Sequence, residues 1–245
     1  MFGRALKPFR DRVFLATKLW ATDAEGAIES VKESLGRLDT DHIDLIQFHG
    51  DLYTDEQTHD ILKPGGVLAD MQALRDEGLV RYFGLAAEGA NSNLSTLVNS
   101  GKFDVLQMQY NLFFQGGYDP SKDAGILVEA ENQGMGIAIM RAFTGGTFAR
   151  WLQWTLPGIE ETEYYPKLIN SLLSFVLSCP LVDVAIVGMR SANRVDSNCA
   201  ISDDVASRID LDELYGRFLR KVAGSDKEVW LATSGRGPED LSLEY

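Results

Sequence analysis

Residues 43–49 read IDLIQFH, and residues 13–18 read VFLATK. Each stretch is short and apolar and ends on a reactive side chain, His49 in the first and Lys18 in the second. An amphipathic helical pattern lies between them, with Ile28, Val31 and Leu35 on one face. Short apolar runs suit strands that are covered on both faces, and the carboxyl ends of parallel strands open onto one crevice. The pattern therefore predicts an α/β enzyme with Lys18 and His49 in one site.

Six apolar stretches are predicted to be buried strands, and helical patterns fill most of the gaps between them. The predicted strands are residues 13–17, 43–48, 80–85, 105–109, 137–140 and 184–187. The predicted helices are residues 23–38, 67–77, 92–99, 124–133, 166–178, 192–200 and 202–219, the first preceded by a capping box of Thr22 and Glu25. This alternation indicates βα units around a parallel sheet.

Two architectures compete for such a chain, the doubly wound sheet and the eight-stranded barrel. A doubly wound sheet that binds a dinucleotide carries Gly-x-Gly-x-x-Gly after an early strand, and no such motif follows any predicted strand here. Polar residues instead lie at the ends of many strands, at Lys18, His49, Gln107, Arg141 and Arg190. This distribution favours a (β/α)8 TIM barrel. Because six strands are predicted and residues 1–11 resemble the end of a helix and its exit loop, we expect the chain to lack the first two strands of that barrel.

The composition limits the function classes. The 245 residues suit one barrel domain, predicted over residues 1–221, followed by a polar tail over residues 222–245. With 36 acidic and 23 basic residues, the net charge of −13 argues against nucleic-acid binding. Two cysteines and three histidines without metal-ligand spacing predict no metal site and a reducing, cytoplasmic location. The start is not a signal peptide, and the longest apolar stretch, 168–182, is too short and polar for a membrane span. The oligomeric state stays open.

Several motifs together resemble a known family. They are RVFLATK at 12–18, SLGRL at 34–38, IDLIQFH at 43–49, GLVRYFG at 78–84, VLQMQYN at 105–111 and IVGMR at 186–190, the last leading to Asn198. In this order, over about residues 3–200, the sequence is similar to the aldo-keto reductases. The resemblance implies a (β/α)8 barrel that binds NADPH without a Rossmann motif. It also implies reduction of a small-molecule aldehyde or ketone by hydride transfer.

The resemblance further implies a catalytic tetrad of Asp, Tyr, Lys and His. In the family, Tyr protonates the carbonyl oxygen, Lys held by Asp lowers the pKa of Tyr, and His orients the carbonyl. Lys18 and His49 match the Lys and His positions. The Asp and Tyr positions belong to the second strand and its loop, which we expect to lie before Met1, so impaired activity is expected. Tyr53 is close to His49 in sequence but belongs to the wrong loop, and Asp44 is expected to have a structural part.

The same resemblance implies a set of cofactor-binding residues. Gln107 matches the position that hydrogen-bonds the nicotinamide carboxamide, whereas residues 86–87 are Ala-Ala where family members often have Ser-Asn. Arg141 stands where an aromatic ring often stacks on nicotinamide, and its guanidinium can stack or meet a phosphate. Gly145, followed by a second glycine, allows the backbone to approach the pyrophosphate.

The segment after the last predicted strand gives the remaining cofactor residues. In the family it grips the adenosine 2′-phosphate and the adenine edge, and here it carries Arg190, Arg194 and Asn198. Arginines at the start of a helix are a ready phosphate site, and two of them favour NADPH over NADH.

Other readings of these residues stay open. Lys18 can be a surface lysine, His49 a core histidine, Gln107 a barrel-layer amide, and Arg190 and Arg194 solvated helix charges. At the level of function, the absent acid and the Ala-Ala pair also suit a non-catalytic, NADP-binding or regulatory protein on the same scaffold. A barrel lyase or isomerase that uses Lys18 as a Schiff base is a third alternative. The sequence does not indicate which carbonyl compound is the substrate.

Overall fold

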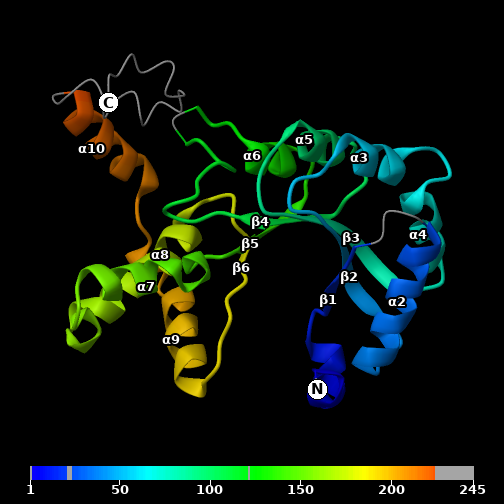
Figure 1. Cartoon of the computed structure of the whole chain (residues 1–245), viewed down its shortest axis with the longest axis horizontal. Coiled ribbons are helices and arrows are strands. Elements are labelled where there is room, and N and C mark those ends of the chain that lie inside the picture. Colours follow the sequence, from blue (N-terminus) through cyan, green and yellow to red (C-terminus); the bar gives the residue numbers. More distant parts are fainter. Residues whose placement is uncertain (1, 21–23, 121, 224–245) are drawn as a thin grey trace.

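A single parallel sheet organises the chain. The computed structural model describes residues 2–20, 24–120 and 122–223. Within these residues six strands pair in chain order, each parallel to the next. They are β1 (Ala16–Leu19), β2 (Ile43–His49), β3 (Val80–Ala87), β4 (Val105–Gln109), β5 (Gly136–Met140) and β6 (Val184–Ala185). Sequential parallel order in a curved sheet is the arrangement of consecutive strands in a (β/α)8 barrel, and Figure 1 shows the sheet curving as an arch.

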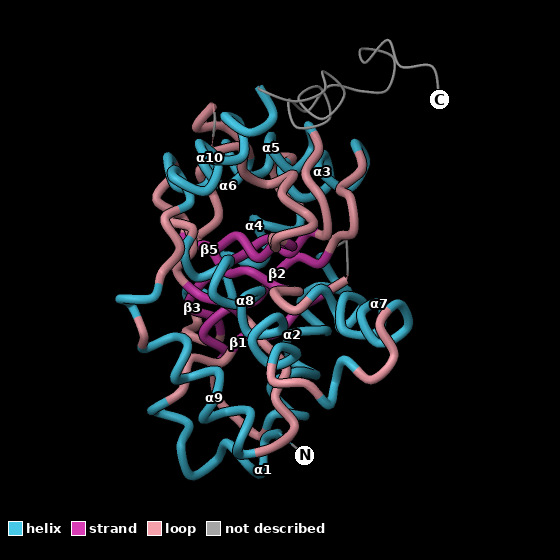
Figure 2. The backbone as a smooth tube through the Cα atoms, turned by 90° about the vertical axis from the view of Figure 1, so that its left-hand side faces the viewer, coloured by secondary structure: helices cyan, strands magenta, loops and turns pink. Residues whose placement is uncertain are grey.

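Helices precede, connect and follow the strands. The α-helices are α1 (Phe2–Leu6), α2 (Ala24–Leu38), α3 (Asp55–Leu62), α4 (Val67–Asp76), α5 (Ser92–Asn99), α6 (Ile126–Asn132), α7 (Thr147–Thr155), α8 (Tyr164–Ser178), α9 (Ala192–Asp203) and α10 (Leu211–Ala223). Short 3-10 turns are η1 (Lys7–Arg12), η2 (Thr144–Gly146), η3 (Ile159–Glu161) and η4 (Val205–Ser207). In Figure 1, α2, α4, α5 and α6 lie on the outer side of the arch, and Figure 2 shows helices surrounding the strands.

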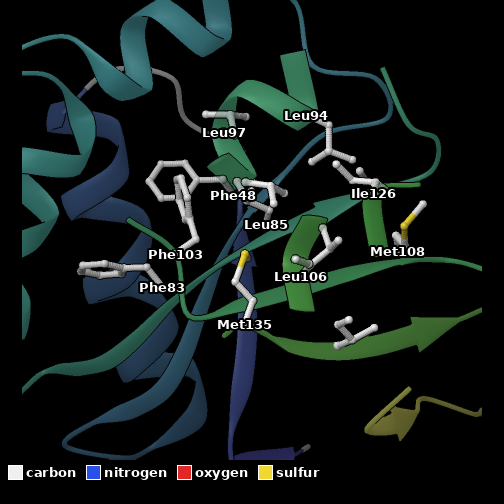
Figure 3. Packing of buried hydrophobic residues seen from close by; sticks show 14 of the residues in the cluster. Phe48, Phe83, Leu85, Leu94, Leu97, Phe103, Leu106, Met108, Ile126 and Met135 are labelled. Atoms are coloured by element: carbon white, nitrogen blue, oxygen red, sulfur yellow. The ribbon is translucent and has the colours of Figure 1, made fainter. Parts of the chain in front are cut away.

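Side-chain alternation along the strands separates a core from an inner face. Residues two apart on a strand point to the same side of the sheet. One set of strand side chains is buried against the helices, and Figure 3 shows it packing with side chains from α5 and α6: Phe48, Phe83, Leu85, Leu94, Leu97, Leu106, Met108 and Ile126. The other set points into the arch, away from this core. The inner face therefore carries the strand side chains that do not pack against the helices.

The sequence placed five strands within two residues of their observed ends and the first strand less well. The strand predicted at residues 13–17 begins three residues later, as β1 (Ala16–Leu19), so Lys18 lies inside the strand. The reason is that the backbone before it makes other hydrogen bonds: Arg10 donates to the Val13 carbonyl, and the Leu15 N–H donates to Asp44.

The helix predictions need three corrections. The helix predicted at 202–219 is broken into η4 and α10. Helix α3 was missed although Thr54 and Gln57 form a capping box at its start, and α7 was missed as well. Thr22, part of the box predicted before α2, and residues 224–245 of the predicted tail lie outside the described residues.

Asp44 fastens the edge of the sheet that carries Lys18. Its carboxylate, 3% exposed, accepts the Leu15 N–H at 2.8 Å and pairs with Arg10 at 3.0 Å and Arg81 at 2.8 Å. Burial raises the pKa of this carboxyl, but the Leu15 N–H and the guanidiniums of Arg81 and Arg10 outweigh burial, and the pKa lies below its usual value. The structural part expected for Asp44 is confirmed, because one carboxylate joins η1, β2, β3 and the lead into β1.

Replacing Asp44 should destabilise the fold in a pH-dependent way. Because Asp44→Asn removes a buried charge that two arginines compensate, it should cost about 3 kcal/mol of unfolding free energy at pH 7. A depressed folded pKa contributes stability above the unfolded pKa, near 4, and that contribution is lost as pH falls through the folded value. Urea unfolding should therefore show a smaller difference between wild type and variant at pH 3 than at pH 7. Glu131→Gln, at an exposed position on α6, is the control, and an equal loss at both pH values would contradict the role of this charge.

Candidate functional site

The strand register brings three predicted site residues to the inner face. Lys18 lies beside Gln47, and His49, two residues further along β2, lies beside Ala86. Ala86 in turn lies beside Gln107 on β4. Because register neighbours and residues two apart share a face, Lys18, His49 and Gln107 occupy one surface, opposite the helix-packed core.

His49 sits in a confined environment. Its ring lies against Trp20, with centroids 3.8 Å apart and an interplanar angle of 37°. Its Nδ1 is buried and has no hydrogen-bond partner among the described residues. Burial lowers the pKa of His49, the Lys18 ammonium lowers it further, and Asp51 and Glu88 oppose them, so that the pKa lies below 6.5. The imidazole is therefore mainly neutral at pH 7.

Lys18 is half-buried, and its pKa is lowered. Burial is the main cause, and the Glu88 carboxylate acts against it. Glu88 was missed by the sequence analysis, although it directly follows the carboxyl end of β3, where polar residues of parallel sheets gather. It thus lies close enough to Lys18 and His49 to influence the charge of both.

Four predicted cofactor residues line one cavity of about 690 Å³: Arg141, Gly145, Arg190 and Arg194. The cavity lies between the segment that follows β5 and the segment that follows β6. Asn198 lies one turn beyond Arg194 on α9, half-buried and outside the lining, and Gln107 is also outside it. The structure therefore divides the predicted residues into an inner-face group and a cavity group.

The backbone of the cavity is held in unusual conformations. Gly145 and Gly146 have φ of 61° and 80°, the left-handed region that glycine enters freely. Arg141 also has a positive φ, 59°, which costs an L-residue about 1 kcal/mol. Its carbonyl accepts hydrogen bonds from Asn111 Nδ2 at 3.0 Å and from the Thr144 N–H at 2.8 Å, which hold the turn. These two contacts hold the backbone of the turn at Arg141.

The cavity has the charge and size for a phosphorylated ligand. Arg190 and Arg194 make no ion pair with any described residue, and Ser191 caps the start of α9 between them. Unpaired guanidiniums at a helix start bind phosphate well. Pockets for ligands of cofactor size span roughly 300–1,000 Å³. The residues present therefore fit the phosphates of a dinucleotide.

Gln107 and Gln47 place side-chain amides on the inner face. Gln107 Nε2 contacts only the Met140 sulfur, a weak acceptor, at 3.3 Å, and Gln47 Nε2 has no partner among the described residues. The Tyr53 hydroxyl donates instead to the Phe48 carbonyl at 2.6 Å, and burial raises its pKa. Tyr53 therefore acts as a packing residue.

The described residues contain neither a metal-binding cluster nor a membrane-spanning helix. No cluster of three or more metal-binding side chains occurs in residues 2–20, 24–120 and 122–223. Over the same ranges no helix combines the length and the apolarity that crossing a membrane requires.

The titration of His49 tests this geometry. Because burial and Lys18 both disfavour the charged ring, the titration midpoint of His49 in proton NMR should lie below 6.5. Lys18→Met should raise that midpoint, since it removes a nearby cation. Lys32→Met, at an exposed position on α2, should leave it unchanged. If the His49 midpoint were the same in wild type and Lys18→Met, Lys18 and His49 would not share a site.

The chain is similar to known oxidoreductases. Residues 1–162 match the family model described as "Aldo/keto reductase family". The "Uncharacterized oxidoreductase YqkF" of Bacillus subtilis (strain 168) is 32% identical over 123 residues, 45% of this chain and 38% of that protein. The "Methylglyoxal reductase DkgA" of Salmonella typhimurium is 35% identical over 86 residues, 34% of this chain and 29% of that protein. These alignments thus span less than half the length of either curated relative.

Solved structures agree on the fold. An aldo/keto reductase from Klebsiella pneumoniae, solved in complex with NADP and acetate, superposes with a TM-score of 0.66 at 22% identity, covering 87% of this chain and 72% of that one. The parallel six-stranded sheet is therefore the (β/α)8 barrel architecture of these enzymes, represented by six strands. With the family model matching about two thirds of its residues, the chain belongs to the aldo/keto reductase family.

Proposed function

We propose that this protein takes part in the NADPH-dependent reduction of a small aldehyde or ketone to an alcohol. The observation that carries the proposal is the placement of Lys18 and His49 on one face, joined through Glu88 and Arg141 to a cation-lined cavity. The name of the Salmonella relative, a methylglyoxal reductase, supports a small carbonyl substrate. The NADP bound to the Klebsiella relative supports the choice of cofactor.

The cavity group holds the phosphorylated part of the cofactor in this proposal. Arg190 and Arg194 bind the adenosine 2′-phosphate, and Asn198 approaches the adenine edge from the next turn of α9. Gly145 exposes backbone to the pyrophosphate. Gln107, whose amide has only a weak partner, binds the nicotinamide carboxamide. NADPH, when bound, supplies the hydride that reduces the carbonyl carbon.

The inner-face group prepares the carbonyl for reduction. His49 is mainly neutral at pH 7, and because its Nδ1 is buried, Nε2 is the nitrogen through which the ring reaches a substrate oxygen. A hydrogen bond from this nitrogen orients the carbonyl. The Lys18 ammonium lowers the pKa of a hydroxyl placed beside it, which makes that hydroxyl a better acid.

The proton donor is the open part of the mechanism. Among the described residues no tyrosine hydroxyl hydrogen-bonds to Lys18 or His49, and that of Tyr53 is directed to a backbone carbonyl. The chain of 245 residues is therefore proposed to reduce carbonyls slowly by itself. A second candidate function follows from the same observation together with the buried Ala86 and Ala87, which offer nicotinamide no side-chain hydrogen bond. It is a non-catalytic, NADP-binding role on the same scaffold.

Two further assignments belong to the proposal. Cys179 and Cys199 are free, which suits a reducing, cytoplasmic environment. We also propose that residues 1–221 form a barrel domain and that residues 222–245 form a polar tail.

Cofactor binding tests both candidate functions. Arg190→Met removes a charge-assisted contact to phosphate and should weaken NADPH binding about 10-fold by calorimetry. NADH, which lacks the 2′-phosphate, should bind more weakly than NADPH to wild type, and Arg190→Met should affect it less. Arg37→Met is the matched control, because Arg37 forms an exposed ion pair with Glu33 on α2. Equal affinity of wild type and Arg190→Met for NADPH would contradict the proposal that this cavity binds the cofactor phosphate.

Turnover separates the two functions. NADPH oxidation with methylglyoxal should be slow for the 245-residue chain, and faster when the chain is extended upstream by segments that carry the Asp and Tyr of the family tetrad. In the extended protein, Lys18→Met should lower kcat by at least about 100-fold, as expected for a group that activates the acid. Binding without turnover in the extended protein, over a panel of carbonyl compounds, would favour the non-catalytic role.

A further inference from the structure

The ion pair between Glu88 and Arg141 stands between the two groups of site residues. Arg141 Nη2 lies 2.7 Å from Glu88 Oε1, and the same arginine lines the cavity with Arg190 and Arg194. Glu88 follows β3, and its carboxylate acts on the charge of both Lys18 and His49. One arginine therefore faces the cavity, and its partner faces the inner-face pair.

The pair is of a kind that an anion can separate. The Arg141 side chain is 50% exposed and that of Glu88 27%, and ion pairs with this exposure contribute little to stability because water screens them. A phosphate group that binds a guanidinium through two parallel hydrogen bonds makes a stronger contact than this carboxylate does. Because the backbone of Arg141 is fixed by Asn111 and Thr144, its guanidinium can exchange partners without movement of the turn.

We propose that Glu88 is a positioning residue that couples the cavity to His49. When an anionic ligand binds Arg141, the ion pair between Arg141 and Glu88 breaks, and the Glu88 carboxylate then acts on Lys18 and His49 without that cation beside it. This inference rests on the proposed function, since the anion is the phosphate part of the cofactor. Its consequence is that ligand binding and the proton affinity of the catalytic pair are linked. In a site without ligand the Arg141 guanidinium offsets part of the Glu88 charge, and in a loaded site the carboxylate has lost that partner.

Four groups determine the charge on His49. Lys18 comes from β1 and Trp20 from the segment after it, Asp51 from the loop after β2, and Glu88 from the segment after β3. Of the three charged groups, Glu88 is the one whose ion pair reaches the cavity, since it pairs with a lining arginine. A free Glu88 carboxylate favours the protonated ring, whereas Lys18 disfavours it. Release of Glu88 therefore raises the titration midpoint of His49.

The experiment follows the His49 ring by proton NMR over a pH series, without ligand, with inorganic pyrophosphate and with NADP⁺. Wild type should show an upward shift of the His49 midpoint with either ligand. Glu88→Gln should lose most of that shift, because the amide carries no charge. Arg141→Met should show the raised midpoint without ligand and no further rise with it. Glu213→Gln, which removes another 2.7 Å surface pair with an arginine, should behave like wild type.

The outcomes are distinguishable. Calorimetry on the same samples reports whether pyrophosphate and NADP⁺ bind. Failure of both to bind wild type would overturn the proposed function and this inference together. Binding with the same His49 shift in wild type and Glu88→Gln would overturn the coupling alone, because the ligand would then act on His49 directly. A shift in wild type that is lost in Glu88→Gln and already present in Arg141→Met supports the coupling.

Discussion

A buried carboxylate sets the position of the strand on which the site depends. Among the described residues β1 has a neighbour on one side, β2, and it is four residues long. Asp44 compensates by holding Leu15, Arg10 and Arg81 at once. Because a slip of one residue would turn Lys18 from the inner face to the helix-packed face, this carboxylate determines whether the ammonium faces His49 at all. The position of Lys18 on the inner face thus depends on the contacts of Asp44, which lie at the opposite end of the strands.

The architecture was predictable because it rests on patterns that are local in sequence. The strands 105–109 and 43–48 are short and mainly apolar, and α5 and α2 have clear apolar faces, so the spacing of apolar residues alone locates these elements. The convergence of Lys18, His49 and Gln107 follows from parallel register once the strands are located. The shift of β1 did not follow, because it depends on hydrogen bonds from Arg10 and Asp44 that are distant in sequence.

The electrostatic part of the site was less accessible from sequence. Arg141 was predicted as a cofactor residue, but its pairing with Glu88 joins residues 53 positions apart and belongs to no motif. Arg141, Gly145, Arg190 and Arg194 line one cavity, whereas Asn198 lies outside the lining, one turn beyond Arg194 on α9. The lowered pKa of His49 depends on burial and on the Lys18 charge, and the sequence specifies neither.

The contact between the rings of Trp20 and His49 gives this site an optical property. Indole emission is quenched more strongly by an imidazolium ion than by a neutral imidazole. With ring centroids 3.8 Å apart, Trp20 is close enough for its emission to follow the protonation of the ring beside it. Of the four tryptophans in the chain, Trp151 and Trp154 lie together on α7, in a different part of the sequence. The fold therefore contains an intrinsic optical indicator next to the group that is expected to orient the substrate.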